Sequence, residues 1–73
     1  MPVRFRDLKR ALRDFGIEVR DPPGGGSHYH AVKDGRTFPI TAHNGLKSEL
    51  PDGYVRGVCA TFGIDEKELR RKL

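Results

Sequence analysis

The sequence predicts a small α+β domain in which helices pack on one face of an antiparallel sheet. Apolar residues recur at helical spacing near both ends of the chain, and the segments between them alternate between apolar and polar residues. A tight-turn signal, Asp34-Gly35, joins two alternating segments as in a hairpin. The predicted order is α-β-β-β-α followed by a short helical tail, with the three-stranded sheet packed against the two main helices.

The first helix is expected over residues 4–15, with Gly16 as its stop. Its apolar face is formed by Phe5, Leu8, Leu12 and Phe15. Its opposite face carries a basic stripe formed by Arg6, Lys9, Arg10 and Arg13. This stripe either follows the phosphates of a nucleic acid or is a solvated helix face.

Strands are expected at residues 17–20, 27–33 and 36–42, where the alternation has a period of two. Pro39 has no N–H group for a β-ladder, so its strand is expected at an edge of the sheet or at a bulge.

The second helix is expected over residues 54–62, with Asp52 as a candidate N-cap and Gly63 as its stop. Cys59 falls on the apolar face of this helix, which predicts a buried thiol. Asp65 and Glu68 have the spacing of a capping box that begins the helical tail.

Size and composition fit one globular domain spanning residues 1–73. No apolar run approaches the roughly 20 residues of a membrane span, and the charged N-terminus lacks a signal core, so a cytoplasmic protein is expected. The chain has a net charge of +4 and 1 cysteine, which excludes an internal disulfide framework. This net positive charge is suited to an acidic partner such as nucleic acid.

The stretch from Gly24 to His30 contains the strongest candidates for a catalytic or phosphate-binding site. Its three glycines permit a close approach of the backbone to a phosphate, because they carry no Cβ. His28 and His30 follow directly, and imidazoles transfer protons near neutral pH. The other interpretation is a loop that runs into a strand with incidental histidines.

Collinear motifs make nearly the whole chain resemble the HicA toxin family, also called YcfA-like. In order, the motifs are Gly26-Ser27-His28, Asp34-Gly35-Arg36, His43-Asn44-Gly45, Leu50-Pro51-Asp52-Gly53 and Phe62-Gly63-Ile64. The resemblance implies the fold of a double-stranded-RNA-binding domain (dsRBD) and cleavage of mRNA without a metal or other cofactor. It also implies His28 as the essential histidine and a HicB-type antitoxin protein as the partner.

The chain differs from the usual family pattern at two places. Tyr29 stands where members often have a second histidine, and Thr41 replaces a proline usual near the end of the third strand. These differences leave open whether His28 or His30 faces the substrate. The period of two puts both histidines on one strand face, where they could divide the acid and base roles.

RNA contains its own nucleophile in the 2′-hydroxyl group, so the enzyme need only transfer protons and stabilise charge on the phosphorus centre. The expected RNA- and phosphate-binding residues are Gly25, Gly26, Ser27, Lys33 and Arg36.

Two other classes remain open. A zinc site could use His28, His30 and His43, although no cysteine or carboxylate spacing accompanies them. A non-catalytic RNA-binding module of the same fold would have the same charge and the same elements.

Overall fold

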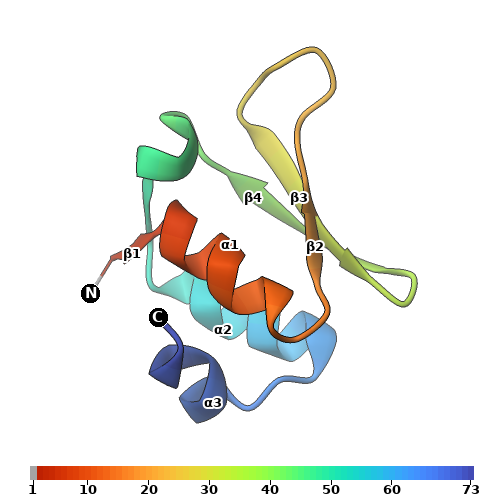
Figure 1. Cartoon of the computed structure of the whole chain (residues 1–73), viewed down its shortest axis with the longest axis vertical. Helices are drawn as coiled ribbons and strands as arrows, with labels where there is room; N and C mark the ends of the chain where they lie inside the picture. The colour runs from red at the N-terminus through yellow and green to blue at the C-terminus, as the bar shows by residue number, and fades with distance from the viewer. Residues whose placement is uncertain (1) are drawn as a thin grey trace.

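The computed structural model describes residues 2–73 and has a three-stranded antiparallel sheet with helices on one face (Figure 1). The strands lie in the order β2-β3-β4, with the bounds Glu18–Arg20, His28–Lys33 and Arg36–Thr41. The helices are α1 (Phe5–Arg13), α2 (Gly53–Phe62) and α3 (Glu66–Arg71). The predicted α+β class and the three-stranded sheet are therefore confirmed.

The β3–β4 hairpin forms where the sequence predicts it. Asp34 and Gly35 both have positive φ, at 51° and 78°, as a tight two-residue hairpin turn requires. The register pairs His28 with Thr41 at one end and Lys33 with Arg36 at the turn. Pro39 lies in β4, which is an edge strand, so that prediction is also confirmed.

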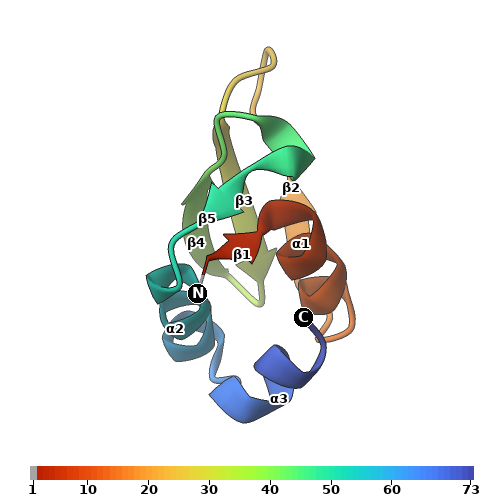
Figure 2. The same cartoon turned by 90° about the vertical axis from the view of Figure 1, so that its left-hand side faces the viewer.

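A second, two-stranded sheet was not predicted. Its strands are β1 (Val3–Arg4) and β5 (Glu49–Leu50), which lie side by side in Figure 2, and the short 3₁₀ helix η1 (Gly45–Lys47) precedes β5. Arg4 belongs to β1, so the first helix begins at Phe5 and not at residue 4, where it was expected to begin. The helix also ends at Arg13, so Phe15 lies beyond it.

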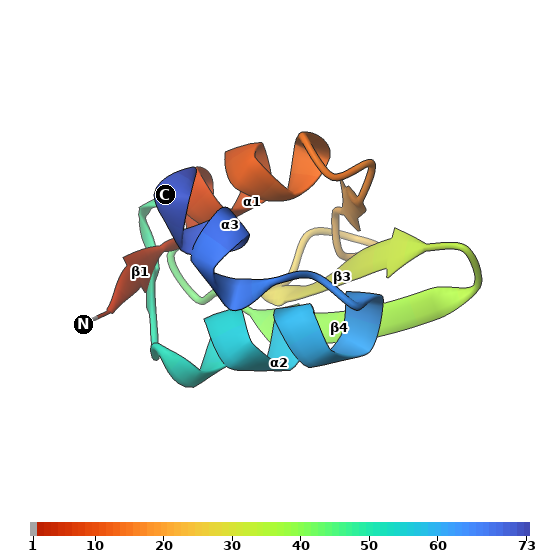
Figure 3. The same ribbon diagram turned by 90° about the horizontal axis from the view of Figure 1, so that it is seen from below.

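The core lies between the sheet and the helices. Figure 3 shows α1 toward the β2 side of the sheet and α2 toward the β4 side. Ala31 and Ile40 point from the middle of the sheet into this layer and are fully buried. Phe5, Leu8 and Leu12 of α1 are fully buried too, as their helical spacing predicts.

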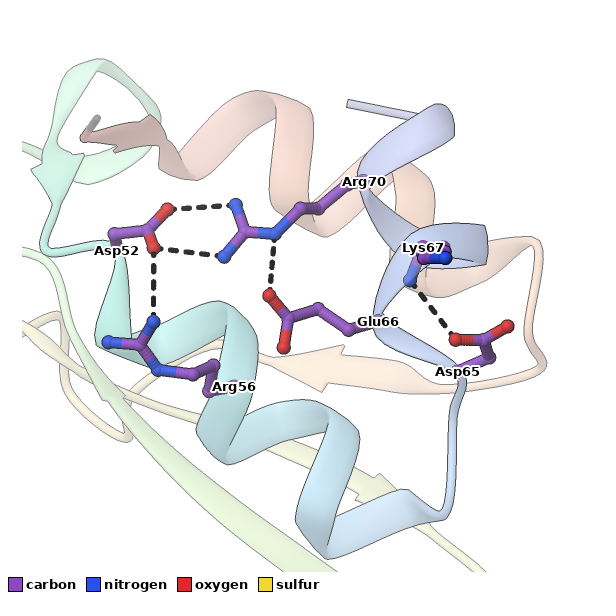
Figure 4. A network of polar contacts seen from close by, with 6 residues as sticks. All are labelled: Asp52, Arg56, Asp65, Glu66, Lys67 and Arg70. Atoms are coloured by element: carbon purple, nitrogen blue, oxygen red, sulfur yellow. Dashed lines mark hydrogen bonds and ion pairs between the residues drawn. The ribbon is translucent and has the colours of Figure 1, made fainter.

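Asp52 does not have the capping role expected for it. It precedes α2, but its carboxylate makes no cap hydrogen bond and instead binds Arg70 of α3. Arg70 Nη1 and Nη2 donate to the two carboxylate oxygens at 2.8 and 2.9 Å, and Arg70 Nε donates to Glu66 at 2.8 Å (Figure 4). The paired guanidinium lowers the pKa of Asp52 below its ordinary value. The Asp52–Arg70 ion pair therefore joins α3 to the start of α2.

The remaining helix ends agree largely with the predictions. Gly63 has φ of 70° and ends α2 in the left-handed conformation. The Asp65 carboxylate accepts a hydrogen bond from the backbone N–H of Lys67 at 3.2 Å, so it does cap α3. Glu68 does not complete the capping box, because it pairs with Arg71 at 3.3 Å.

Within residues 2–73, no helix combines the length and the apolar character that crossing a bilayer requires.

Candidate functional site

The face of the three-stranded sheet that points away from the helices is open, and we call it the outer sheet face. Residues that pair across an antiparallel sheet share a face, so the register defines its membership. It consists of Glu18, Arg20, His28, His30, Val32, Thr37, Pro39 and Thr41. Every one of these side chains is exposed or half-buried.

His28 and His30 lie on this face as neighbours along β3, and both are exposed. Two residues of strand separate their Cα atoms by about 7 Å. Tyr29 between them points inward, where its ring packs on Phe5 with the ring centres 4.7 Å apart. The predicted alternation is therefore confirmed, and both imidazoles are open to a molecule that lies across the sheet.

The glycine-rich loop enters β3 directly at His28 (Figure 1). Gly24 and Gly25 have φ of 72° and 76°, so they occupy a conformation that other residues rarely adopt. The Gly25 N–H donates to the carbonyl of Pro22 at 3.2 Å, so it is used within the loop. The Ser27 carbonyl accepts a hydrogen bond from Ala42 N–H at 2.8 Å, which joins the end of the loop to the end of β4.

Gly26 differs from the two glycines before it. Its φ is not positive, and a Cβ there would lie 3.8 Å from the Cβ of Pro22, an ordinary contact distance. Within residues 2–73 its N–H makes no backbone hydrogen bond. Of the two amides expected to bind phosphate, that of Gly26 is therefore the free one.

Lys33 and Arg36 do not join the histidines. They pair with each other at the far end of β3 and β4, about 17 Å from His28 along the strand. Lys33 Nζ donates to the carbonyl of Phe15 at 2.7 Å, just beyond α1, and Arg36 donates to the carbonyl of Thr61 in α2 at 3.3 Å. Both cations thus lie at the C-terminal ends of helices, where positive charge is stabilising.

Arg20 is the cation that the structure does bring to the histidines, and sequence reasoning missed it. It pairs with His30 across β2 and β3, on the outer sheet face, and its side chain is 65% exposed. Its Nε donates to Glu18 at 3.1 Å. The alternation of residues 17–20 already placed Arg20 on the outer side of its strand, but only the β2–β3 register shows its partner.

The third histidine, His43, follows β4 and is exposed. With Thr41 it lines a pocket of about 320 Å³ that continues toward Glu49 and Tyr54. Among residues 2–73 no group of three or more histidine, cysteine or acidic side chains is placed to hold a metal ion. The three-histidine zinc site considered above is therefore not assembled in that part of the chain.

Cys59 lies away from this face. It is buried in the core on α2, as predicted, and burial raises the pKa of its thiol above the ordinary value. A protonated, enclosed thiol of this kind is a packing residue rather than a nucleophile.

Comparison of the chain with protein-family models, with curated proteins and with solved structures gives no match. The resemblance to HicA toxins therefore rests on the sequence motifs alone.

Proposed function

We propose that the chain is a metal-independent endoribonuclease of the HicA type, with a dsRBD-like fold, acting in the cytoplasm as the toxin of a toxin–antitoxin pair. The observation that carries the proposal is the position of His28 and His30. They are exposed side by side on an open sheet face, where the glycine-rich loop enters β3. RNA would lie across the outer sheet face.

The reaction needs two proton transfers, and the pair of imidazoles is suited to both. One neutral imidazole takes the proton of a ribose 2′-hydroxyl group as its oxygen attacks the adjacent phosphorus. The other, as imidazolium, gives a proton to the departing 5′-oxygen. The products are a 2′,3′-cyclic phosphate and a free 5′-hydroxyl group, so atoms and charge balance without a metal ion.

Charge on the phosphorus centre needs a fixed donor, and two groups lie in suitable positions. Arg20 extends from β2 opposite His30, and its guanidinium presents several N–H donors to phosphate oxygens. The free N–H of Gly26 comes two residues before His28. In this arrangement Arg20 takes the phosphate-binding role expected from sequence for Lys33 and Arg36.

The decisive experiment follows cleavage of a labelled RNA by the purified protein and by His28→Ala, His30→Ala and His43→Ala. Removal of either β3 histidine should lower the rate by about 10² to 10⁴, the usual contribution of a general acid or base. His43→Ala, outside the strand, is the matched control and should keep most of the activity. Circular dichroism should show the same fold for all variants, since all three side chains are exposed.

Cleavage should also persist in excess EDTA. Activity that disappears with chelation and returns with zinc or magnesium would contradict the mechanism. Full activity in a folded His28→Ala, His30→Ala double variant would show that the outer sheet face is not the catalytic site.

A HicB-type antitoxin is the proposed protein partner, and its acidic surface would cover the outer sheet face and compete with RNA. Binding to the folded state alone would add roughly 2.7 kcal/mol of stability at a partner concentration one hundred times the Kd. Thermal unfolding and RNA cleavage followed in one titration test both effects. A tight complex in which cleavage continues would place the partner elsewhere.

The second candidate is a non-catalytic RNA-binding module. The openness of the outer sheet face favours it, because His28 and His30 are both exposed and neither lines the 320 Å³ pocket at His43. RNA bound by the intact protein without cleavage, and weakened by Arg20→Ala, would support this function instead.

A further inference from the structure

A groove between α1 and β2 combines positive charge with an apolar floor, and we call it the α1–β2 groove. It has a volume of about 630 Å³. Its rim carries the four cationic side chains of α1, which are Arg6, Lys9, Arg10 and Arg13. These are the residues of the basic stripe, which the proposed cleavage site does not use.

The charge of the rim is only partly neutralised. Asp7, the one acidic residue of α1, lies 3.4 Å from both Arg6 and Arg10. Lys9 and Arg13 make no ion pair with any of residues 2–73. Glu18 of β2 also lines the groove, but its carboxylate accepts a hydrogen bond from Arg20 Nε at 3.1 Å. The α1 side of the groove therefore presents uncompensated positive charge.

Apolar side chains form the other part of the groove. Ile17 and Val19 lie at its base, buried and half-buried. Leu46 of η1 borders it with 45% of its surface exposed, and within residues 2–73 it is the only large apolar side chain classed as exposed. An exposed leucine beside a concave apolar base is a suitable seat for one apolar side chain of a partner.

We infer that the α1–β2 groove binds an acidic peptide segment of a partner protein that carries one apolar anchor residue. Carboxylates of the segment would face Lys9 and Arg13, and the anchor would cover Leu46 and Val19. A nucleic acid would use the cations but would leave Leu46 exposed, and a flat lipid surface would not fill a concave groove. The groove also borders β2, whose second edge pairs with no strand within residues 2–73.

The inference does not depend on the proposed nuclease activity. The probe is a short fluorescein-labelled peptide of glutamates with a single central leucine, measured by fluorescence anisotropy with the whole protein. Two comparison probes separate the contribution of the apolar anchor from that of charge. They are the same peptide with serine in place of leucine, and a labelled single-stranded RNA. Amide chemical shifts of ¹⁵N-labelled protein locate the binding, and are expected to change in α1, β2 and around Leu46.

Three variants complete the test. Lys9→Glu and Leu46→Ser should each weaken binding of the leucine peptide about fivefold to tenfold, one by charge reversal and the other by loss of apolar contact. Lys67→Glu, an exposed position on α3 with the same change of charge, is the matched control and should leave the affinity unchanged.

Three results would overturn the inference. The leucine peptide does not bind, or it binds no more tightly than the serine peptide, or RNA shifts the same amides more strongly with no effect of Leu46→Ser. The last result would make the groove a nucleic-acid surface.

Discussion

Gly57 lies on α2 where the ring of Phe38 from β4 occupies the space of a side chain. A Cβ at this position would lie 2.7 Å from Phe38 Cε1 and Cζ, closer than two carbon atoms can pack. The same ring lies edge-on to Tyr54, with the ring centres 5.9 Å apart. The absence of a side chain at one residue therefore sets how closely α2 approaches the sheet.

Gly57→Ala is expected to lower the free energy of unfolding by about 1–3 kcal/mol, because the added methyl group must displace Phe38 or α2. Gly53→Ala is the matched control on the same helix. A Cβ at Gly53 meets no atom within 4 Å, so its effect should stay within about 0.5 kcal/mol. Urea unfolding measures both. Equal stability of the two variants would show that Phe38 moves aside without cost, and Phe38→Leu should relieve the effect of Gly57→Ala if the ring causes it.

At the scale of elements, α3 depends on its attachment to the rest of the molecule. It has 6 residues, and isolated helices shorter than about 12 residues are not stable in water. Leu69 anchors it in the core, fully buried, and Arg70 joins it to Asp52 at the start of α2 (Figure 4). The helix is therefore formed by tertiary contacts rather than by its own propensity.

The Asp52–Arg70 pair predicts a dependence of stability on pH. The folded state lowers the pKa of Asp52, so its contribution is complete above the ordinary aspartate value, near 4, and is lost as the pH falls through the lowered pKa. Asp52→Asn should therefore be less stable than the natural protein at pH about 7. The difference should shrink as the solution is acidified below pH about 4.

Thermal unfolding across this pH range tests the prediction, with Glu68→Gln as the control. Glu68 pairs with the exposed Arg71, and such surface pairs contribute little. A difference between Asp52→Asn and the natural protein that does not change with pH would mean that the carboxylate acts through packing and not through its charge.

At the scale of the whole molecule, the two faces of the sheet hold basic residues in different surroundings. Arg20 lies on the outer sheet face beside His30, whereas Lys33 reaches across the inner side to the carbonyl of Phe15. A cation at the C-terminal end of a helix contributes mainly to stability. The period of two along β3 already puts Lys33 on the opposite strand face from His28 and His30, whereas only the β2–β3 register puts Arg20 beside His30.

Lys33→Met should accordingly lower the free energy of unfolding by about 0.5–1 kcal/mol, and leave RNA cleavage unchanged. Lys67→Met, an exposed lysine on α3, should change neither quantity. Chemical unfolding and the RNA assay are run on the same preparations. Loss of cleavage at unchanged stability would return Lys33 to the phosphate-binding role expected from sequence.

Local patterns in the sequence were sufficient for most elements. The helical spacing of Phe5, Leu8 and Leu12 and the positive φ demanded at Asp34-Gly35 act over a few residues, so they predict structure without knowledge of the fold. The same is true of the alternation that put His28 and His30 on one strand face. The α+β class and the shared strand face of the two histidines are confirmed, while the chemistry assigned to them stays a prediction.

Partners that are distant in the sequence were decided only by the tertiary structure. The β1–β5 pairing joins strands of 2 residues each, too short to show a period. It lies where the start of α1 meets the end of η1, and the Phe5 N–H donates to the Ser48 carbonyl there at 2.8 Å. Asp52 stands at the position of a helix N-cap in the sequence. Its carboxylate instead accepts two charge-assisted hydrogen bonds from Arg70, 18 residues later. Which cation stands beside the histidines depends on the register of β2 against β3, and register is set by packing across the sheet rather than by neighbours along the chain.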